Sequence, residues 1–156
     1  MSAQMDYYKL SSLTIFRDLD KKELEIIQKH IFEQNVKKDS MLFMEDMPGE
    51  FLYIIISGRV DIIKETIDKE KIVLASMGAN EIIGEMSLID SQPRSATGVT
   101  SEDSVLLVMN NQDFDEMLKS DPRIAAKLLI GLLKTVSGRL RIMDKKIEGI
   151  KKIVKR

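Results

Sequence analysis

The sequence predicts an α+β domain in which a strand-rich, mainly antiparallel body of the sandwich or barrel type lies between two helical regions. Three observations predict this class. Apolar residues recur at spacings of three and four in residues 1–32, short β-type segments fill residues 33–109, and the helical spacing returns in residues 110–156. Many short strands at close spacing favour an antiparallel body over a parallel sheet with crossover helices.

The N-terminal region is expected to be helical. Its apolar positions Leu10, Leu13, Phe16, Leu24, Ile27 and Ile31 follow helical spacing up to Phe32. Asp20 followed by Glu23 is typical of a capping box at a helix start. His30, the only histidine, is interpreted as a residue on the flank of this helix.

The middle region contains short β-type segments separated by turn residues such as Pro48-Gly49, Ser57-Gly58 and Met77-Gly78. The expected strands are residues 41–43, 51–56, 60–63, 71–75, 95–100 and 105–108. The C-terminal region then predicts a short helix over residues 110–119 and a long one that begins at Asp121-Pro122. The long helix carries the apolar pattern Leu129, Leu132, Val136, Leu140, Met143, Ile147, Ile150 and Val154.

Composition narrows the classes of function. The 156 residues suit a single domain over residues 1–156, with 44% apolar and 31% charged residues. A net charge of -1 argues against a protein that coats nucleic acid. There is no cysteine and one histidine, so disulfides, thiolate catalysis and a histidine-built metal site are not expected. No signal sequence and no membrane-length apolar run is evident, and we expect a cytoplasmic protein.

Residues 82–97 carry the chemistry. Gly84 permits close approach of a ligand to the backbone, and the free N–H groups of a helical turn from Glu85 can bind an anion. Glu85 can accept hydrogen bonds from a sugar, whereas Arg94 and Ser95 can donate to phosphate. Taken singly, Gly-Glu is a common helix start and an arginine before a strand is usually a solvated edge charge, so each fragment alone favours a structural role.

The combined segment resembles the phosphate-binding cassette of cyclic nucleotide-binding domains. The matching positions are Gly84, Glu85, Ser87, Leu88, Pro93, Arg94, Ser95 and Ala96. The resemblance extends over about residues 10–150, through the hairpins of residues 43–64 and the long helix with Gly138-Arg139-Leu140-Arg141. It implies a mainly-β antiparallel jelly-roll barrel, the double-stranded β-helix, with N-terminal helices at 1–32, the β-roll at 33–109 and C-terminal helices at 110–156.

The chain departs from the family pattern at three expected glycines, which are Asp39, Asp46 and Asn80. Asp and Asn are the non-glycine residues that best tolerate left-handed backbone, so the same turns can form. Ile83 stands where an aromatic residue is common, which should alter packing more than binding.

The resemblance also implies residue roles. Glu85 would bind the ribose 2′-hydroxyl, and Arg94 the cyclic phosphate. Ser95, Ala96 and the backbone of Gly84, Glu85, Met86 and Ser87 would complete the phosphate site. Ile72, Val73 and Leu74 would line the ribose and base, and Arg139 and Met143 would form a lid over the base, or else face solvent or an interface. Ser95 favours cAMP, because cGMP-selective relatives often carry threonine there.

These roles predict a non-enzymatic sensor that binds cAMP, with cGMP as the alternative, and needs no metal. Ligand would draw the long helix onto the β-roll, and that helix is expected to pair with its twin in a homodimer. A separate effector protein would carry the output. The cluster Lys145, Lys146, Lys151, Lys152, Lys155 and Arg156 is interpreted as a solvated face rather than a nucleic-acid tail.

Other functions remain open. The chain could be a ligand-free interaction module that keeps the fold, or the sensor fragment of a transcription regulator. The retained Glu85 and Arg94 argue against a module that has lost its ligand. A metal-dependent jelly-roll enzyme of the cupin type needs a cluster of histidines, which this sequence does not have.

Overall fold

The computed structural model describes residues 6–154, so Met5, Lys155 and Arg156 lie outside the described residues. The N-terminal region forms three short helices, α1 (Tyr7–Ser11), η1 (Thr14–Phe16) and α2 (Lys21–Ile27). The predicted capping box is confirmed, because the Asp20 carboxylate accepts from the Glu23 N–H at 2.9 Å and the Glu23 carboxylate accepts from the Asp20 N–H at 2.9 Å.

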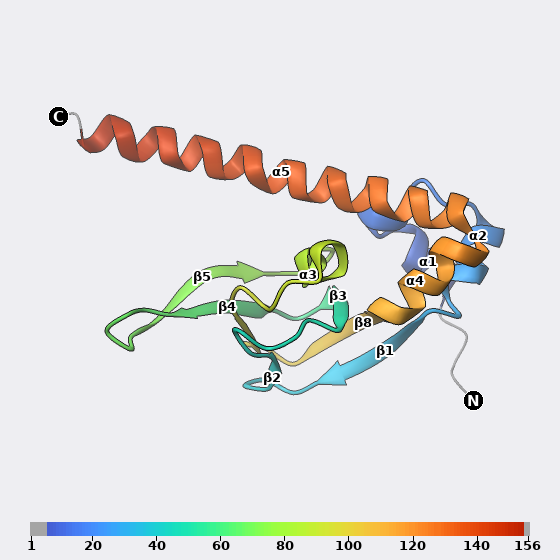
Figure 1. The fold of residues 1–156 in the computed structure, drawn as a ribbon, viewed down its shortest axis with the longest axis horizontal. Helices are drawn as coiled ribbons and strands as arrows, with labels where there is room; N and C mark the ends of the chain where they lie inside the picture. Colours follow the sequence, from blue (N-terminus) through green and yellow to red (C-terminus); the bar gives the residue numbers. More distant parts are fainter. Residues whose placement is uncertain (1–5, 155–156) are drawn as a thin grey trace.

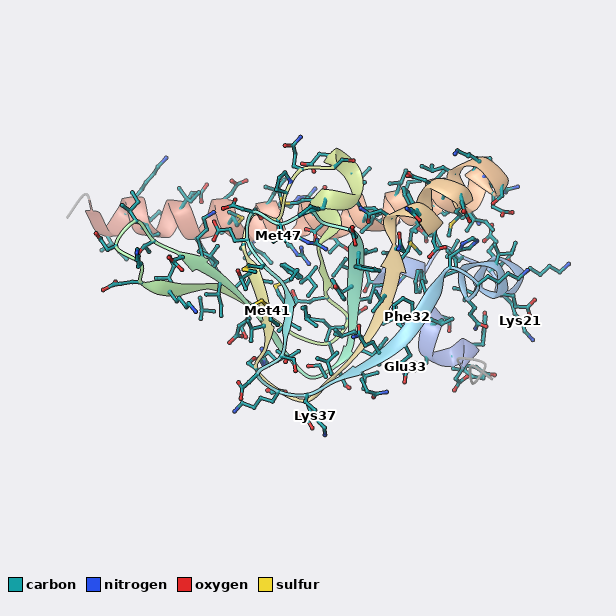
Figure 2. All side chains as sticks on the ribbon, turned by 60° about the horizontal axis from the view of Figure 1, so that its bottom comes forward. Lys21, Phe32, Glu33, Lys37, Met41 and Met47 are labelled. Atoms are coloured by element: carbon teal, nitrogen blue, oxygen red, sulfur yellow. The ribbon has the colours of Figure 1, made fainter. Side chains whose placement is uncertain are left out.

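The prediction that the helical region runs to Phe32 is wrong. A strand, β1 (Ile31–Val36), begins there and pairs with the last strand from Ile31 opposite Met109 to Val36 opposite Ser104. Ile31 is nevertheless buried in one cluster with Leu24 and Ile27. β1 is an edge strand whose central residues, including Phe32 and Glu33, are exposed, so it has no apolar alternation by which to recognise it (Figure 2).

The strands form two four-stranded antiparallel sheets. Sheet one has the order β1-β8-β3-β6, and sheet two the order β2-β7-β4-β5. The bounds are β2 Met41–Phe43, β3 Phe51–Ser57, β4 Val60–Glu65, β5 Lys71–Met77, β6 Ile82–Ile83, β7 Thr97–Thr100 and β8 Ser104–Asn110. The predicted antiparallel β-roll is therefore confirmed, and its described strands form two four-stranded sheets without closing into one continuous barrel.

Sheet one separates two apolar clusters. On β3, Leu52 and Ile54 pack against the helices, whereas Tyr53 and Ile55 face the interior of the roll. β8 and β6 divide their side chains in the same way, with Leu107 and Ile82 on the helical side. Because both faces of the sheet are buried, β3 reads as a continuous apolar run in the sequence.

The three non-glycine turn residues adopt the expected left-handed backbone, with φ of 63° at Asp39, 65° at Asp46 and 68° at Asn80. Asn80 also uses its side chain. Its amide oxygen accepts from the Thr14 N–H at 2.9 Å, and its amide nitrogen donates to the Thr14 hydroxyl at 2.7 Å. Asn80 thus ties η1 to the turn that precedes β6, which a glycine could not do.

The C-terminal region contains α4 (Asn111–Ser120) and α5 (Pro122–Val154), with α3 (Glu85–Asp90) inserted between β6 and β7. The 33 residues of α5 span about 50 Å. Figure 1 shows α5 beginning over the N-terminal helices and continuing above the hairpin of β4 and β5. No helix in residues 6–154 combines the length and apolar character needed to cross a membrane.

The first half of α5 is attached to the N-terminal helices. Leu128 and Leu132 are buried, and a Cβ at Gly131 would lie 2.5 Å from the Ile15 carbonyl oxygen, so glycine allows close packing on η1. Two ion pairs add to this contact. Lys127 donates to both carboxylate oxygens of Glu23 at 2.8 and 2.7 Å, and Lys134 pairs with Asp18 at 2.8 Å.

The Glu23–Lys127 pair predicts a pH dependence of stability. The hydrogen bond from Lys127 lowers the pKa of Glu23 below its ordinary value of 4.5. The pair should therefore stabilise the fold above about pH 4.5, and this contribution should disappear as the pH falls through the lowered pKa. Lys127→Met, which leaves the capping box in place, should cost about 0.5–1 kcal/mol at pH 7. In urea titrations the difference from the unmodified protein should close at acidic pH; a constant difference would contradict this.

Candidate nucleotide-binding site

A cavity of about 240 Å³ opens beside α3 and contains most of the residues predicted for the phosphate site. Sheet two supplies its floor through Ile62, Ala75 and Met77. The walls come from residues 83–87 and 92–96 together with Phe43, Asp90 and Arg139. The residues that line this one cavity include Gly84, Glu85, Met86, Ser87, Arg94, Ser95 and Ala96.

Gly84 shapes the wall nearest to Arg94. It lies between β6 and α3 with φ of 81°, a backbone conformation that side chains rarely adopt. A Cβ at Gly84 would be 2.4 Å from an Arg94 guanidinium nitrogen and 2.8 Å from the Phe51 carbonyl oxygen. Both the backbone angle and the space therefore require glycine. Ser87, one turn further on, is buried and closes the same corner against Gly49.

Arg94 is a buried cation, with only 4% of its surface exposed. It donates to the Phe51 carbonyl at 2.6 Å and to the Gly84 carbonyl at 3.3 Å, and its Nε has no partner. Within residues 6–154 no carboxylate lies within ion-pair distance of Arg94. Burial lowers the pKa of the guanidinium, although an arginine remains charged at neutral pH.

The charge of Arg94 is balanced instead by weaker interactions. The guanidinium carbon lies 4.5 Å from the centre of the Phe43 ring. The two carbonyl dipoles provide further compensation. A guanidinium has five N–H donors, of which the protein uses two, so donors remain for an anion. This donor set and the unpartnered Nε fit a phosphate group.

Glu85 makes a contact that the sequence did not predict. Its carboxylate pairs with Arg139 of α5 at 2.7 Å, and Arg139 also donates to the Ile82 carbonyl. The side chains are 14% and 27% exposed, so water screens this pair less than a surface pair. Arg139, which we expected to lie over the base, thus joins α5 to the start of α3.

A second cavity, of about 450 Å³, lies between β5 and α5. It shares Ala75, Met77 and Arg139 with the first cavity, so the two adjoin. Leu74, Glu81, Met143, Lys146 and Ile147 complete its lining. Leu74 and Met143 therefore line this second cavity and not the first one, which contains the cassette residues.

Ile72 and Val73 line neither cavity and are exposed. The pairing of β4 with β5 shifts between Ile62 and Ile63, which are opposite Ala75 and Val73. Because of this shift, Ala75 and Met77 are the β5 residues that reach the first cavity. Sequence reasoning missed Ala75 and Met77, although their spacing of two in a strand is a usable signal. It also missed Phe43, for which the sequence offers no comparable signal.

Comparisons with known proteins agree with this geometry. The family model described as cyclic nucleotide-binding domain matches residues 33–121. The Cyclic AMP receptor protein of Thermus thermophilus is 28% identical over 134 residues, which are 86% of this chain and 60% of the relative. A CRP-like cAMP-activated global transcriptional regulator of Mycobacterium tuberculosis is 28% identical over 77% of this chain and 54% of its own. The chain thus spans little more than half of these regulators.

Solved structures give the same result. A cyclic nucleotide-binding domain from Methylobacillus flagellatus superposes with a TM-score of 0.84 at 29% identity, covering 91% of this chain and 82% of that one. The regulatory domain of Toxoplasma gondii PKA, crystallised with cAMP, gives a TM-score of 0.62 at 28% identity, covering 70% of this chain and 41% of its own. The matched fold, the cassette and the cavity lead to one conclusion: this chain belongs to the cyclic nucleotide-binding domain family.

Proposed function

We propose that this chain is a non-enzymatic regulatory module that binds cAMP and transmits binding through α5. The observation that carries the proposal is the buried Arg94, which has free donors and no carboxylate partner within the described residues. Burying a charge without a counter-ion is costly, so such an arginine is expected where an anion binds. A cyclic phosphate supplies one negative charge and oxygens that suit the guanidinium fork.

Glu85 supports the ribose part of the proposal. Its carboxylate faces the same cavity as Arg94 and can accept a hydrogen bond from the 2′-hydroxyl. In the structure Arg139 already pairs with this carboxylate. A ribose that binds Glu85 must therefore share it with Arg139 or displace Arg139, and either change acts directly on α5. This supports the coupling of ligand to the position of the helix.

The second cavity supports a site for the base. It adjoins the phosphate cavity and is walled mainly by the apolar side chains of Leu74, Met77, Met143 and Ile147. A planar base can bury its faces in such a space. Met143 and Leu74 keep their proposed role near the base, whereas Ile72 and Val73 would need a movement of the hairpin to reach it.

Several observations favour cAMP over cGMP. Ser95 lines the cavity at the position where cGMP-selective relatives often have threonine. The names of similar proteins from Thermus and Mycobacterium include cyclic AMP or cAMP, and the Toxoplasma structure contains cAMP.

An exposed apolar stripe along α5, from Leu133 to Ile150, supports a homodimer. Leu133, Val136, Leu140, Met143, Ile147 and Ile150 recur at alternating spacings of three and four, and all but Val136 are among the exposed large apolar residues. This is a heptad pattern, which a second copy of the same helix can bury in a coiled coil, with Met143 and Ile147 lying where that seam would border the second cavity. We propose that the dimer, or a separate effector protein that contacts it, receives the signal in the cytoplasm; no direct role for nucleic acid is proposed.

Arg94→Ala should reduce affinity for cAMP about 100-fold, because it removes the charge-assisted hydrogen bonds to the phosphate. Isothermal titration calorimetry measures this loss. Arg59→Ala is the matched control, since Arg59 pairs with Glu102 and lines neither of the two cavities. Unchanged affinity in Arg94→Ala would exclude Arg94 as the phosphate ligand, and no cAMP binding by the unmodified protein would exclude the proposed function.

Ser95→Thr tests the preference for the base. The extra methyl restricts the hydroxyl to fewer rotamers and matches the residue of many cGMP-selective relatives. We expect the ratio of cAMP affinity to cGMP affinity to fall by about threefold to tenfold in a competition titration. A ratio that stays constant, or an unmodified protein that prefers cGMP, would contradict the role assigned to Ser95.

Leu140→Glu should dissociate the dimer, because it places a charge in the proposed heptad seam. Ile142→Glu is the control, since Ile142 is equally exposed on α5 but lies outside the heptad positions. Light scattering after size-exclusion chromatography, over a range of concentrations, gives the mass of each variant. An unmodified protein that is a monomer throughout, or two variants with the same mass, would argue against this interface.

A further inference from the structure

Phe43 lies beside Arg94 although nothing in the nucleotide chemistry requires an aromatic residue there. The Arg94 guanidinium carbon is 4.5 Å from the centre of the ring, well within the range of a cation–π contact. Phe43 also lines the phosphate cavity. Its side chain comes from β2, whereas Arg94 precedes β7, and β2 and β7 are neighbours in sheet two.

Two further contacts hold the ring in place. A Cβ at Gly98 would lie 2.6 Å from two ring carbons of Phe43, so glycine on β7 makes room for the ring. Phe43 also stacks on Tyr53, with ring centres 6.0 Å apart and planes inclined by 26°. The aromatic face presented to Arg94 is therefore fixed by packing.

The backbone confines the guanidinium as well. Cβ atoms at Gly49 and Gly84 would lie 3.1 and 2.4 Å from Arg94 guanidinium atoms, so both positions admit only backbone. The carbonyls of Phe51 and Gly84 then fix the fork by accepting one hydrogen bond each. Arg94 is thus oriented before any ligand binds.

We propose that Phe43 is a positioning residue for Arg94, which rests on the proposed role of Arg94 in binding the cyclic phosphate. A carboxylate in place of the ring would stabilise the buried cation but would also occupy N–H donors and compete with the phosphate. The aromatic face stabilises positive charge without accepting from those donors in the plane of the fork. Phe43 therefore lets the protein keep a charged, oriented and available arginine in a buried position.

Affinity measurements on Phe43 variants test this. Phe43→Leu keeps an apolar side chain but removes the aromatic face, and should weaken cAMP binding about tenfold. Phe43→Tyr, which retains the face, should bind close to normally. Phe32→Leu is the matched control, because Phe32 lies on the edge strand β1 and lines neither cavity (Figure 2). Equal affinities for Phe43→Leu and Phe32→Leu would overturn the proposal.

A double-mutant cycle separates positioning from a general loss of structure. If Phe43 acts through Arg94, Phe43→Leu should have little further effect in the Arg94→Ala background. The same tenfold loss in both backgrounds would show that Phe43 acts by another route and would overturn the proposal.

A spectroscopic measurement on the ligand-free protein keeps this test distinct from the proposed function. The ring current of Phe43 should shift the Arg94 Nε–H resonance, which is assigned by its loss in Arg94→Lys. The shift should persist in Phe43→Tyr and disappear in Phe43→Leu. An Arg94 signal that does not respond to Phe43→Leu would refute positioning even if cAMP binds; failure of cAMP to bind with the shift present would instead refute the function.

Discussion

The site depends on keeping one positive charge buried and unpaired. Transfer of an ion out of water is unfavourable, and most buried arginines are compensated by a carboxylate. Here the direct contacts of Arg94 are two carbonyls and an aromatic face, none of which carries a net charge, and the Glu85 carboxylate adds a longer-range electrostatic contribution. The surrounding backbone reflects this constraint: a side chain at Gly84 would clash with the guanidinium and one at Gly98 with the Phe43 ring, while Gly49 is kept free of a side chain mainly by Ser87.

The two charged side chains of the site, Glu85 and Arg94, differ in their ion pairing. Arg94 forms no ion pair with a carboxylate within the described residues and feels Glu85 only at longer range, whereas Glu85 is paired directly with Arg139 from the long helix. An anion that binds Arg94 need not displace a carboxylate, whereas a hydroxyl that binds Glu85 must compete with Arg139. In the proposed function, the phosphate would therefore bind without displacing a carboxylate, whereas the sugar would bind where it competes with a residue of α5.

The sequence predicted local features best. The capping box at Asp20 and the left-handed turns at Asp39 and Asn80 depend on chemistry within a few positions and are found as expected, and the cassette residues line one cavity. The β-roll followed from strand spacing and from family resemblance, but β1 did not, because an exposed edge strand has no apolar alternation.

The features that escaped prediction depend on partners distant in the chain. The pairing of Arg139 with Glu85 joins residues 54 positions apart, and the contact of Phe43 with Arg94 joins residues from two strands. The bulge that selects Ala75 and Met77 over Ile72 and Val73 is a property of how β4 and β5 pair. The sequence pattern of a single segment does not determine these contacts, because they form only when distant segments pack together.

The two-sided burial of sheet one sets the limits of the smallest fragment that can fold. The region matched by the family model, residues 33–121, contains the strands except for the first two residues of β1, and lacks η1 and α5. Cutting there would expose Leu52, Ile54 and Leu107 to water and would also break the link between Thr14 and Asn80. We therefore expect the helices outside the matched region to belong to the same folding unit, which would make the segment recognised by the family model smaller than the physical domain.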